Sequence, residues 1–123
     1  MKLNSPEGFL KVGGVVLVLL ALVGYLGIIP ENSVFYLTNG ENLAHLVLGV
    51  VALLLVYLVD NDDIQKWVVV LVGVLALVFV VWGFLVSGNP YQNFYGLANL
   101  ENPADQVLHL VVGVWALWAA FSK

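Results

Sequence analysis

Four long apolar stretches limit what this chain can fold into more than any other feature of its sequence. They are Phe9–Ile29, Leu43–Val59, Ile64–Val86 and Val107–Phe121. Counted from the helix caps described below, the second and fourth extend to roughly 20 residues, which at about 1.5 Å per residue matches the ~30 Å hydrocarbon core of a bilayer. Of the 123 residues, 62% are hydrophobic and only 10% are charged, too few to form a water-facing surface. We therefore expect all four stretches to cross a membrane.

The four stretches are predicted to be helices rather than strands. Their apolar residues run without the alternation typical of a barrel strand, and four strands cannot close into a barrel in lipid. Many of these residues are β-branched, but within a bilayer a helix satisfies its own backbone hydrogen bonds. The first stretch lies beside Lys2 and Lys11, as in a signal peptide, yet it is too long and no small-residue cleavage site follows it. We expect it to be retained, which gives a single all-α integral membrane domain over residues 1–123.

Part of the sequence occurs twice. The segment Thr38–Leu53 reads TNGENLAHLVLGVVAL, and the segment Asn102–Leu117 reads NPADQVLHLVVGVWAL. His109 follows His45 by 64 residues (109 − 45), and the glycine four residues after each histidine keeps the same separation. The chain is therefore predicted to contain a duplicated unit.

The apolar stretches that precede these motifs repeat as well. Gly73 follows Gly14 by 59 residues (73 − 14), and Gly83 follows Gly24 by the same number (83 − 24). Each unit then contains two transmembrane helices joined by one connection. The chain is predicted to form two tandem helical hairpins of like orientation, about residues 8–60 and 64–122. Parallel repeats of this kind are related by a twofold axis along the membrane normal.

The basic residues predict how the transmembrane helices are oriented. There are four lysines and no arginine, and the lysines lie at the termini or in the short second connection: Lys2, Lys11, Lys66 and Lys123. Because basic residues favour the cytoplasmic side, both termini are predicted to be cytoplasmic and both histidine motifs to lie on the outer side. The four tryptophans, Trp67, Trp82, Trp115 and Trp118, are expected at the membrane interfaces. We expect an integral protein of a prokaryotic cell membrane.

Each repeated motif begins with residues that start helices. Thr38 and Asn102 are the predicted N-caps. Glu41 and Asp105, three residues later, are predicted to complete capping boxes, in which the acid returns a bond to the backbone of the cap. The positive end of the helix dipole also favours an acid there. The histidine follows the acid by four positions, and the glycine follows the histidine by four, so the three residues lie on one helical face.

The paired motif resembles a known family. A cap and an acid followed by H-L-V-x-G-V-x-A-L, in the second and fourth of four transmembrane helices, is similar to the uncharacterised membrane family catalogued as domain of unknown function 4383. The resemblance covers nearly the whole chain, and its specific part is the two motifs: Thr38, Glu41, His45 and Gly49, with Asn102, Asp105, His109 and Gly113. Family members typically have Asn after the acid, which Asn42 retains and Gln106 does not. The resemblance implies the architecture and singles out the motifs, but it implies no activity.

Two hypotheses for the histidines follow. In the first, each imidazole hydrogen-bonds the acid one turn earlier or a carbonyl of a neighbouring helix, and the glycines let helices approach closely. The protein is then a structural or interaction module with no cofactor. In the second, the two imidazoles bind haem as axial ligands or hold a divalent metal. The haem-binding residues would be His45, His109, Gly49 and Gly113, and the metal ligands would be His45, His109, Glu41 and Asp105.

Other functional classes are less favoured by the sequence. An oligomeric pore or a transporter is a weaker hypothesis, because the middles of all four apolar stretches contain no ionisable residue. No enzyme is predicted, since there is no cysteine, no serine with a recognisable base and no glycine-rich phosphate loop. A net charge of −4 without a basic patch argues against binding nucleic acid. The expected partners are the lipid bilayer and either a second copy of the chain or another membrane protein.

Overall fold

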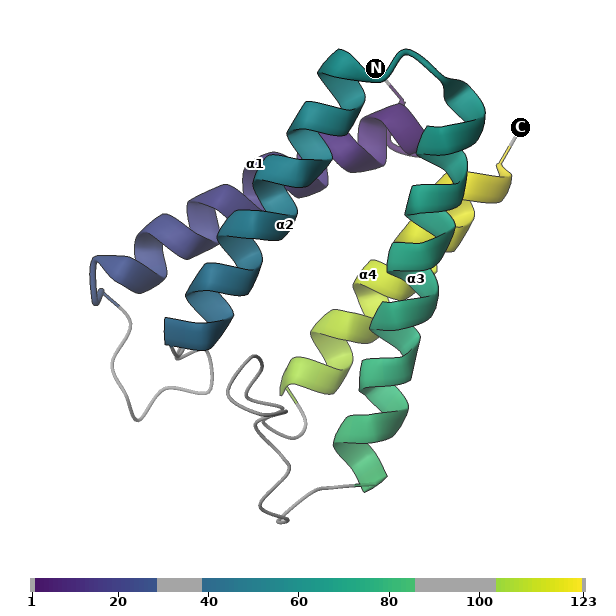
Figure 1. Cartoon of the computed structure of the whole chain (residues 1–123). Coiled ribbons are helices and arrows are strands. Elements are labelled where there is room, and N and C mark those ends of the chain that lie inside the picture. The colour runs from purple at the N-terminus through teal and green to yellow at the C-terminus, as the bar shows by residue number, and fades with distance from the viewer. Residues whose placement is uncertain (1, 29–38, 86–103, 123) are drawn as a thin grey trace.

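The computed structural model describes residues 2–28, 39–85 and 104–122, and these ranges contain four helices (Figure 1). They are α1, Pro6–Tyr25; α2, Asn39–Leu58; α3, Asp62–Leu85; and α4, Ala104–Phe121. The prediction of an all-helical chain with four helices is confirmed. Helix α1 ends at Tyr25, four residues before the end of the first apolar stretch.

Three of the helices contain stretches that are long and apolar enough to cross a membrane. These stretches are Pro6–Tyr25, Gly40–Leu58 and Asp62–Trp82. In α4 the apolar stretch is shorter and covers Val107–Phe121. Within the part of the chain that the structure describes, the fourth predicted transmembrane helix is therefore shorter than the other three.

Local signals in the sequence determine the two ends of α1. The Ser5 hydroxyl accepts a hydrogen bond from the backbone N–H of Gly8 at 3.0 Å, and Pro6 occupies the first helical turn, where its missing N–H costs nothing. Beyond the other end, Gly27 has a φ of 69°, a left-handed conformation that is common just after helices. The left-handed conformation of Gly27 therefore ends α1, although the apolar sequence continues to Ile29.

The connection between α2 and α3 is short and held by two amide side chains. The Asn61 side-chain oxygen accepts a hydrogen bond from the backbone N–H of Ile64 at 3.1 Å, which caps α3. Buried Gln65 donates from Nε2 to the carbonyl oxygen of Val59 at 3.0 Å, which ties the start of α3 to the residue that follows α2. These bonds fix the turn without making α2 and α3 a packed pair.

The helices pack in two pairs, α1 with α2 and α3 with α4 (Figure 1). A glycine on each helix allows the close approach. A Cβ atom added to Gly49 would lie 2.9 Å from the carbonyl oxygen of Gly14, and one added to Gly113 would lie 3.3 Å from that of Gly73. The first distance is shorter than real Cβ atoms show and the second is tighter than most Cβ contacts, so the glycines allow the two backbones of each pair to approach closely.

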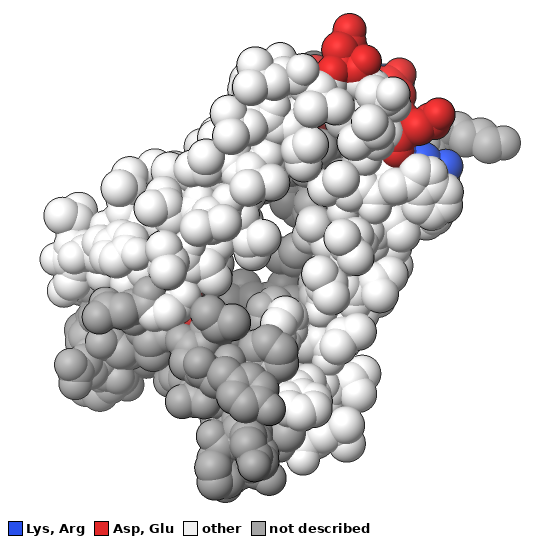
Figure 2. Space-filling view, in the orientation of Figure 1, with Lys and Arg blue, Asp and Glu red and all other residues white. Residues whose placement is uncertain are grey.

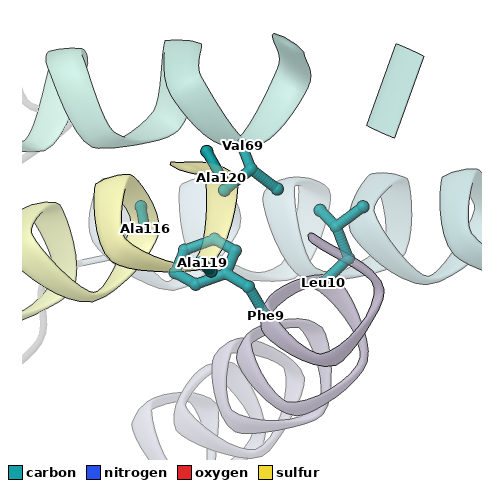
Figure 3. Packing of buried hydrophobic residues seen from close by; sticks show 6 residues of the cluster. All are labelled: Phe9, Leu10, Val69, Ala116, Ala119 and Ala120. Carbon is teal, nitrogen blue, oxygen red and sulfur yellow. The ribbon is translucent and has the colours of Figure 1, made fainter. Parts of the chain in front are cut away.

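The two antiparallel helix pairs, the α1–α2 hairpin and the α3–α4 hairpin, meet at the end of the molecule that holds both termini (Figure 1). Buried side chains from α1, α3 and α4 form the core there, shown in Figure 3: Phe9, Leu10, Val69, Ala116, Ala119 and Ala120. The ring of Phe9 packs edge-on against Trp115, with ring centroids 4.6 Å apart. Away from this terminal core the hairpins diverge.

Two hydrogen bonds strengthen the same junction. The Trp115 indole donates from Nε1 to the carbonyl oxygen of Leu3 at 2.9 Å, and the amide of Asn4 donates to the Ser122 hydroxyl at 2.9 Å. They join the segment before α1 to α4 and to the residue that follows α4. The junction between the hairpins therefore depends on the N-terminal residues as well as on the apolar core.

Large apolar side chains are exposed along all four helices, including Leu48 at 54%, Leu71 at 56% and Val111 at 60%. In the view of Figure 2, acidic and basic side chains gather at one end of the molecule, over the connection between α2 and α3. Asp60, Asp62 and Asp63 are exposed in this region. Most of the remaining described surface in that view carries no charge.

Candidate functional site

The two predicted capping boxes lie at the limits of the described residues. Helix α2 begins one residue after Thr38, but Thr38 and Asn102 both lie outside the described residues. Glu41 lies in the first turn of α2, as the motif predicts, and is only 7% exposed. Asp105 belongs to α4, but its side chain is outside the described part of the structure. The capping boxes therefore stay predictions.

The two histidines come from different hairpins. His45 lies about 9 Å along the axis from the first residue of α2, and His109 about 8 Å from that of α4, at about 1.5 Å per residue. The structure thus places both at the end where the hairpins diverge, opposite the terminal core.

The surroundings of the two imidazoles differ. The His109 ring stacks on Phe79 of its own hairpin, with centroids 5.5 Å apart and planes 28° from parallel. Nδ1 of His45 is buried and has no hydrogen-bond partner among residues 2–28, 39–85 and 104–122. Within those ranges, Nδ1 of His45 therefore does not make the hydrogen bond that the structural hypothesis expects of each imidazole. A buried polar atom of this kind calls for an explanation, and a bound water, ion or ligand is one.

The glycines of the two motifs face the partner helix of their own hairpin. A Cβ on Gly49 would lie 2.8 Å from Cγ2 of Val18 in α1, and a Cβ on Gly113 would lie 2.8 Å from Cδ2 of Leu77 in α3. The room that each glycine leaves is filled by the other helix of its hairpin. Their position therefore supports helix packing, and it assigns them no contact with a haem.

Asn42 is a buried polar residue whose placement the sequence did not predict. It is 1% exposed, and its amide lies so close to Gly24 of α1 that a Cβ on that glycine would overlap it. Its Oδ1 has no hydrogen-bond partner in the described ranges. The sequence repeat already pointed to Gly24, because Gly83 is its counterpart in the second unit. The surroundings of Gly83 and the side chain of Gln106 lie outside what the structure describes.

The described residues do not by themselves form a metal site. No group of three or more His, Cys, Asp and Glu side chains that could hold a metal ion occurs within 2–28, 39–85 and 104–122. Of the four predicted ligands, Glu41, His45 and His109 are described and the side chain of Asp105 is not. The ligands that the described residues offer for a metal or a haem are therefore the two imidazoles of His45 and His109.

Comparison of the chain with family models, with curated proteins and with solved structures finds no match. The resemblance to domain of unknown function 4383 therefore stays a prediction.

Proposed function

We propose that this chain is an integral membrane protein whose four helices cross the bilayer as two tandem hairpins of like orientation. Three helices of sufficient length and the exposed apolar side chains on all four support insertion, because such a surface is unfavourable in water and matches lipid. The shorter apolar part of α4 reaches the length needed when the residues before Val107 are added. The lysine positions support cytoplasmic termini.

The matched glycines support the proposal that the hairpins are duplicates. Gly14 meets Gly49 in the first hairpin, and Gly73 meets Gly113 in the second. These two contacts use corresponding residues of the repeat, since the offsets are 59 and 64 residues (73 − 14 and 113 − 49). Equivalent helix crossings are what a duplicated hairpin requires.

The function that the site supports best is that of a non-enzymatic structural or interaction module centred on the imidazole pair. One observation carries this proposal: His45 and His109 come from separate hairpins, and both lie at the end where the helices of those hairpins make few contacts with each other. Polar contacts between membrane helices stabilise association modestly, by about 1 kcal/mol each. The pair is therefore suited to adjusting how the hairpins associate with each other or with a partner.

Replacing both imidazoles tests this role. The double variant His45→Gln, His109→Gln is expected to lower the thermal stability of the purified protein, or to change its oligomeric state in detergent. Leu48→Ala is a matched control, because Leu48 lies one turn from His45 and its side chain is 54% exposed. A double variant as stable as this control, with an unchanged oligomeric state, would show that the imidazole pair has no structural role.

The second candidate function is binding of haem or of a divalent metal by the same two imidazoles. The observation that favours it is the buried Nδ1 of His45, which has no partner in the described ranges. The residues that would hold the group are His45 and His109, and a haem held by these two histidines would supply electron-transfer chemistry. Protein extracted gently from its host would show a Soret band, or a stoichiometric metal by mass spectrometry, that is lost in His45→Phe. Absence of both signals from the unmodified protein would eliminate this candidate.

A further inference from the structure

Helix α4 carries an apolar groove along an exposed face. The groove has a volume of about 540 Å³ and is lined by apolar side chains: Leu3, Leu110, Val111, Val114, Trp115 and Trp118. All of these residues belong to the described ranges, and all but Trp115 are exposed. Gly113 and Ala116 lie on another face of α4, which packs against α3. This α4 groove is therefore open to the surroundings of the helices.

The α4 groove has about the length of one bilayer leaflet. Trp118 follows Leu110 by 8 residues (118 − 110), which is about 12 Å along the helix axis. One leaflet supplies about 15 Å of the ~30 Å hydrocarbon core. Trp118 lies in the last turn of α4, where a tryptophan suits the membrane interface, and Leu110 lies near the middle of the helix. A helix of a second copy would contact the whole width of the core, so an acyl chain matches this groove better than a helix does.

A lysine without an ion-pair partner in the described ranges adjoins the interfacial end of the groove. Lys2 directly precedes Leu3 of the groove lining and is exposed. Lys11 forms an ion pair with Glu7 at 2.7 Å, and Lys66 lies over two aromatic rings, but within those ranges Lys2 makes neither kind of contact. A lysine near the cytoplasmic surface of a membrane attracts anionic head groups. The groove therefore has an apolar wall and, at its interfacial end, a cation that can bind a phosphate.

The acids and the second groove of the same hairpin support this assignment. Asp62 and Asp63 lie in the first turn of α3, which packs against a different face of α4. A second apolar groove, of about 390 Å³, lies on α3. Its lining residues are Val74, Leu77, Val78, Val81, Trp82 and Leu85. Val74, the lining residue nearest in sequence to Lys66, follows it by 8 residues (74 − 66), or about 12 Å along α3. Of the two grooves, the α4 groove is therefore the one with a cation beside it.

We propose that the α4 groove binds an anionic phospholipid of the cytoplasmic leaflet. One acyl chain lies along Leu110, Val114 and Trp118, and the phosphate contacts the ammonium group of Lys2. The inference rests on the proposed membrane insertion with cytoplasmic termini. It goes beyond the proposed role of the imidazole pair, because it assigns a ligand to a different face of the molecule.

Quenching of tryptophan fluorescence tests this lipid directly. The chain has 4 tryptophans, so the double variant Trp67→Phe, Trp82→Phe keeps Trp115 and Trp118 of the groove as the only tryptophan emitters. In bilayers that contain phosphatidylglycerol or phosphatidylcholine with brominated acyl chains, bromine quenches the tryptophans that the lipid contacts. A lysine near the membrane surface favours an anionic lipid by about fivefold. Brominated phosphatidylglycerol is therefore expected to bind about five times more tightly than brominated phosphatidylcholine.

Two pairs of variants in this background locate the lipid. Lys2→Gln is expected to remove the preference for phosphatidylglycerol, whereas Lys11→Gln, which makes the same charge change at an ion-paired lysine, should keep it. Val114→Phe fills the groove and should also remove the preference. Leu48→Phe is its control, because Leu48 is exposed on α2, away from the groove.

The outcomes separate this inference from the proposed membrane function. Equal binding of the two brominated lipids by the inserted protein would indicate ordinary lipid contact without a site and would overturn the inference. Absence of quenching by either lipid would show that protein covers the groove, which would overturn it too, as would a preference that survives both Lys2→Gln and Val114→Phe. Failure of the chain to insert into bilayers would instead contradict the proposed membrane function and the inference with it.

Discussion

The backbone contact at Gly49 predicts a specific cost for adding a single methyl group. In Gly49→Ala the new Cβ would lie 2.8 Å from Cγ2 of Val18, 2.9 Å from the carbonyl oxygen of Gly14 and 3.0 Å from the backbone nitrogen of Val18. Two of these three atoms belong to the backbone and cannot rotate away. Overpacking of this kind costs about 1–3 kcal/mol, and the better helix propensity of alanine returns about 1 kcal/mol. We expect a net loss of about 1 kcal/mol.

Gly13 provides the matched control for this measurement. It lies in α1 beside Gly14, but a Cβ added to Gly13 has nothing within 4 Å. Gly13→Ala therefore gains the helix propensity without the steric cost and is expected to be neutral or stabilising by up to about 1 kcal/mol. The difference between Gly49→Ala and Gly13→Ala isolates the steric cost, about 1–3 kcal/mol.

The second hairpin predicts a graded result. A Cβ on Gly113 would lie 2.8 and 2.9 Å from side-chain atoms of Leu77, and its distance from the nearest backbone atom, the Gly73 oxygen, is 3.3 Å. A side chain can move to relieve the contact, so Gly113→Ala should cost less than Gly49→Ala. Reversible unfolding in mixed micelles, followed by far-UV circular dichroism, measures the three free energies. If Gly49→Ala is as stable as Gly13→Ala, the close helix crossing described here is wrong.

Three further predictions concern the termini, the junction and the buried amide. Tags placed at the two ends of the chain should be accessible from the same side of the membrane in intact cells or oriented vesicles; accessibility from opposite sides would contradict the hairpin arrangement. Trp115→Phe should lower the free energy of unfolding by about 1 kcal/mol, because it removes the donor to the Leu3 carbonyl and keeps the aromatic contact with Phe9. Asn42→Leu should change stability by less than about 1 kcal/mol, since Oδ1 has no partner in the described ranges, and a loss above about 2 kcal/mol would show that the amide is satisfied in the membrane.

The four helices could be predicted from the sequence because an apolar stretch in lipid has few alternatives to a helix. The end of α1 could not be predicted from hydrophobicity, since the apolar sequence continues to Ile29 while Gly27 turns the backbone. The glycine repeat contained the information for the contacts within each hairpin. It did not specify that Gly49 and Gly113 face their own hairpins rather than the space between the histidines.

The contacts between the hairpins were harder to predict than those within them. Trp115 is a reasonable interface residue from its sequence position, but its hydrogen bond to Leu3 joins residues 112 apart. Such a contact depends on how two preformed hairpins meet, and no local pattern encodes it. The burial of Asn42 is a similar case, because its environment is provided by Gly24 on another helix.

The position of the candidate site follows from where small residues remain available for packing between the hairpins. Lipid is as apolar as the helix surfaces, so two hairpins associate only where close packing or polar contacts favour it. The motif glycine of α4, Gly113, is used against α3, which leaves Ala119 and Ala120 near its C-terminal end for contact with the other hairpin. The hairpins are therefore held together at that end. Toward the start of α4 larger side chains such as Val107 and Leu108 are exposed, and in the described ranges α4 makes few contacts with α2.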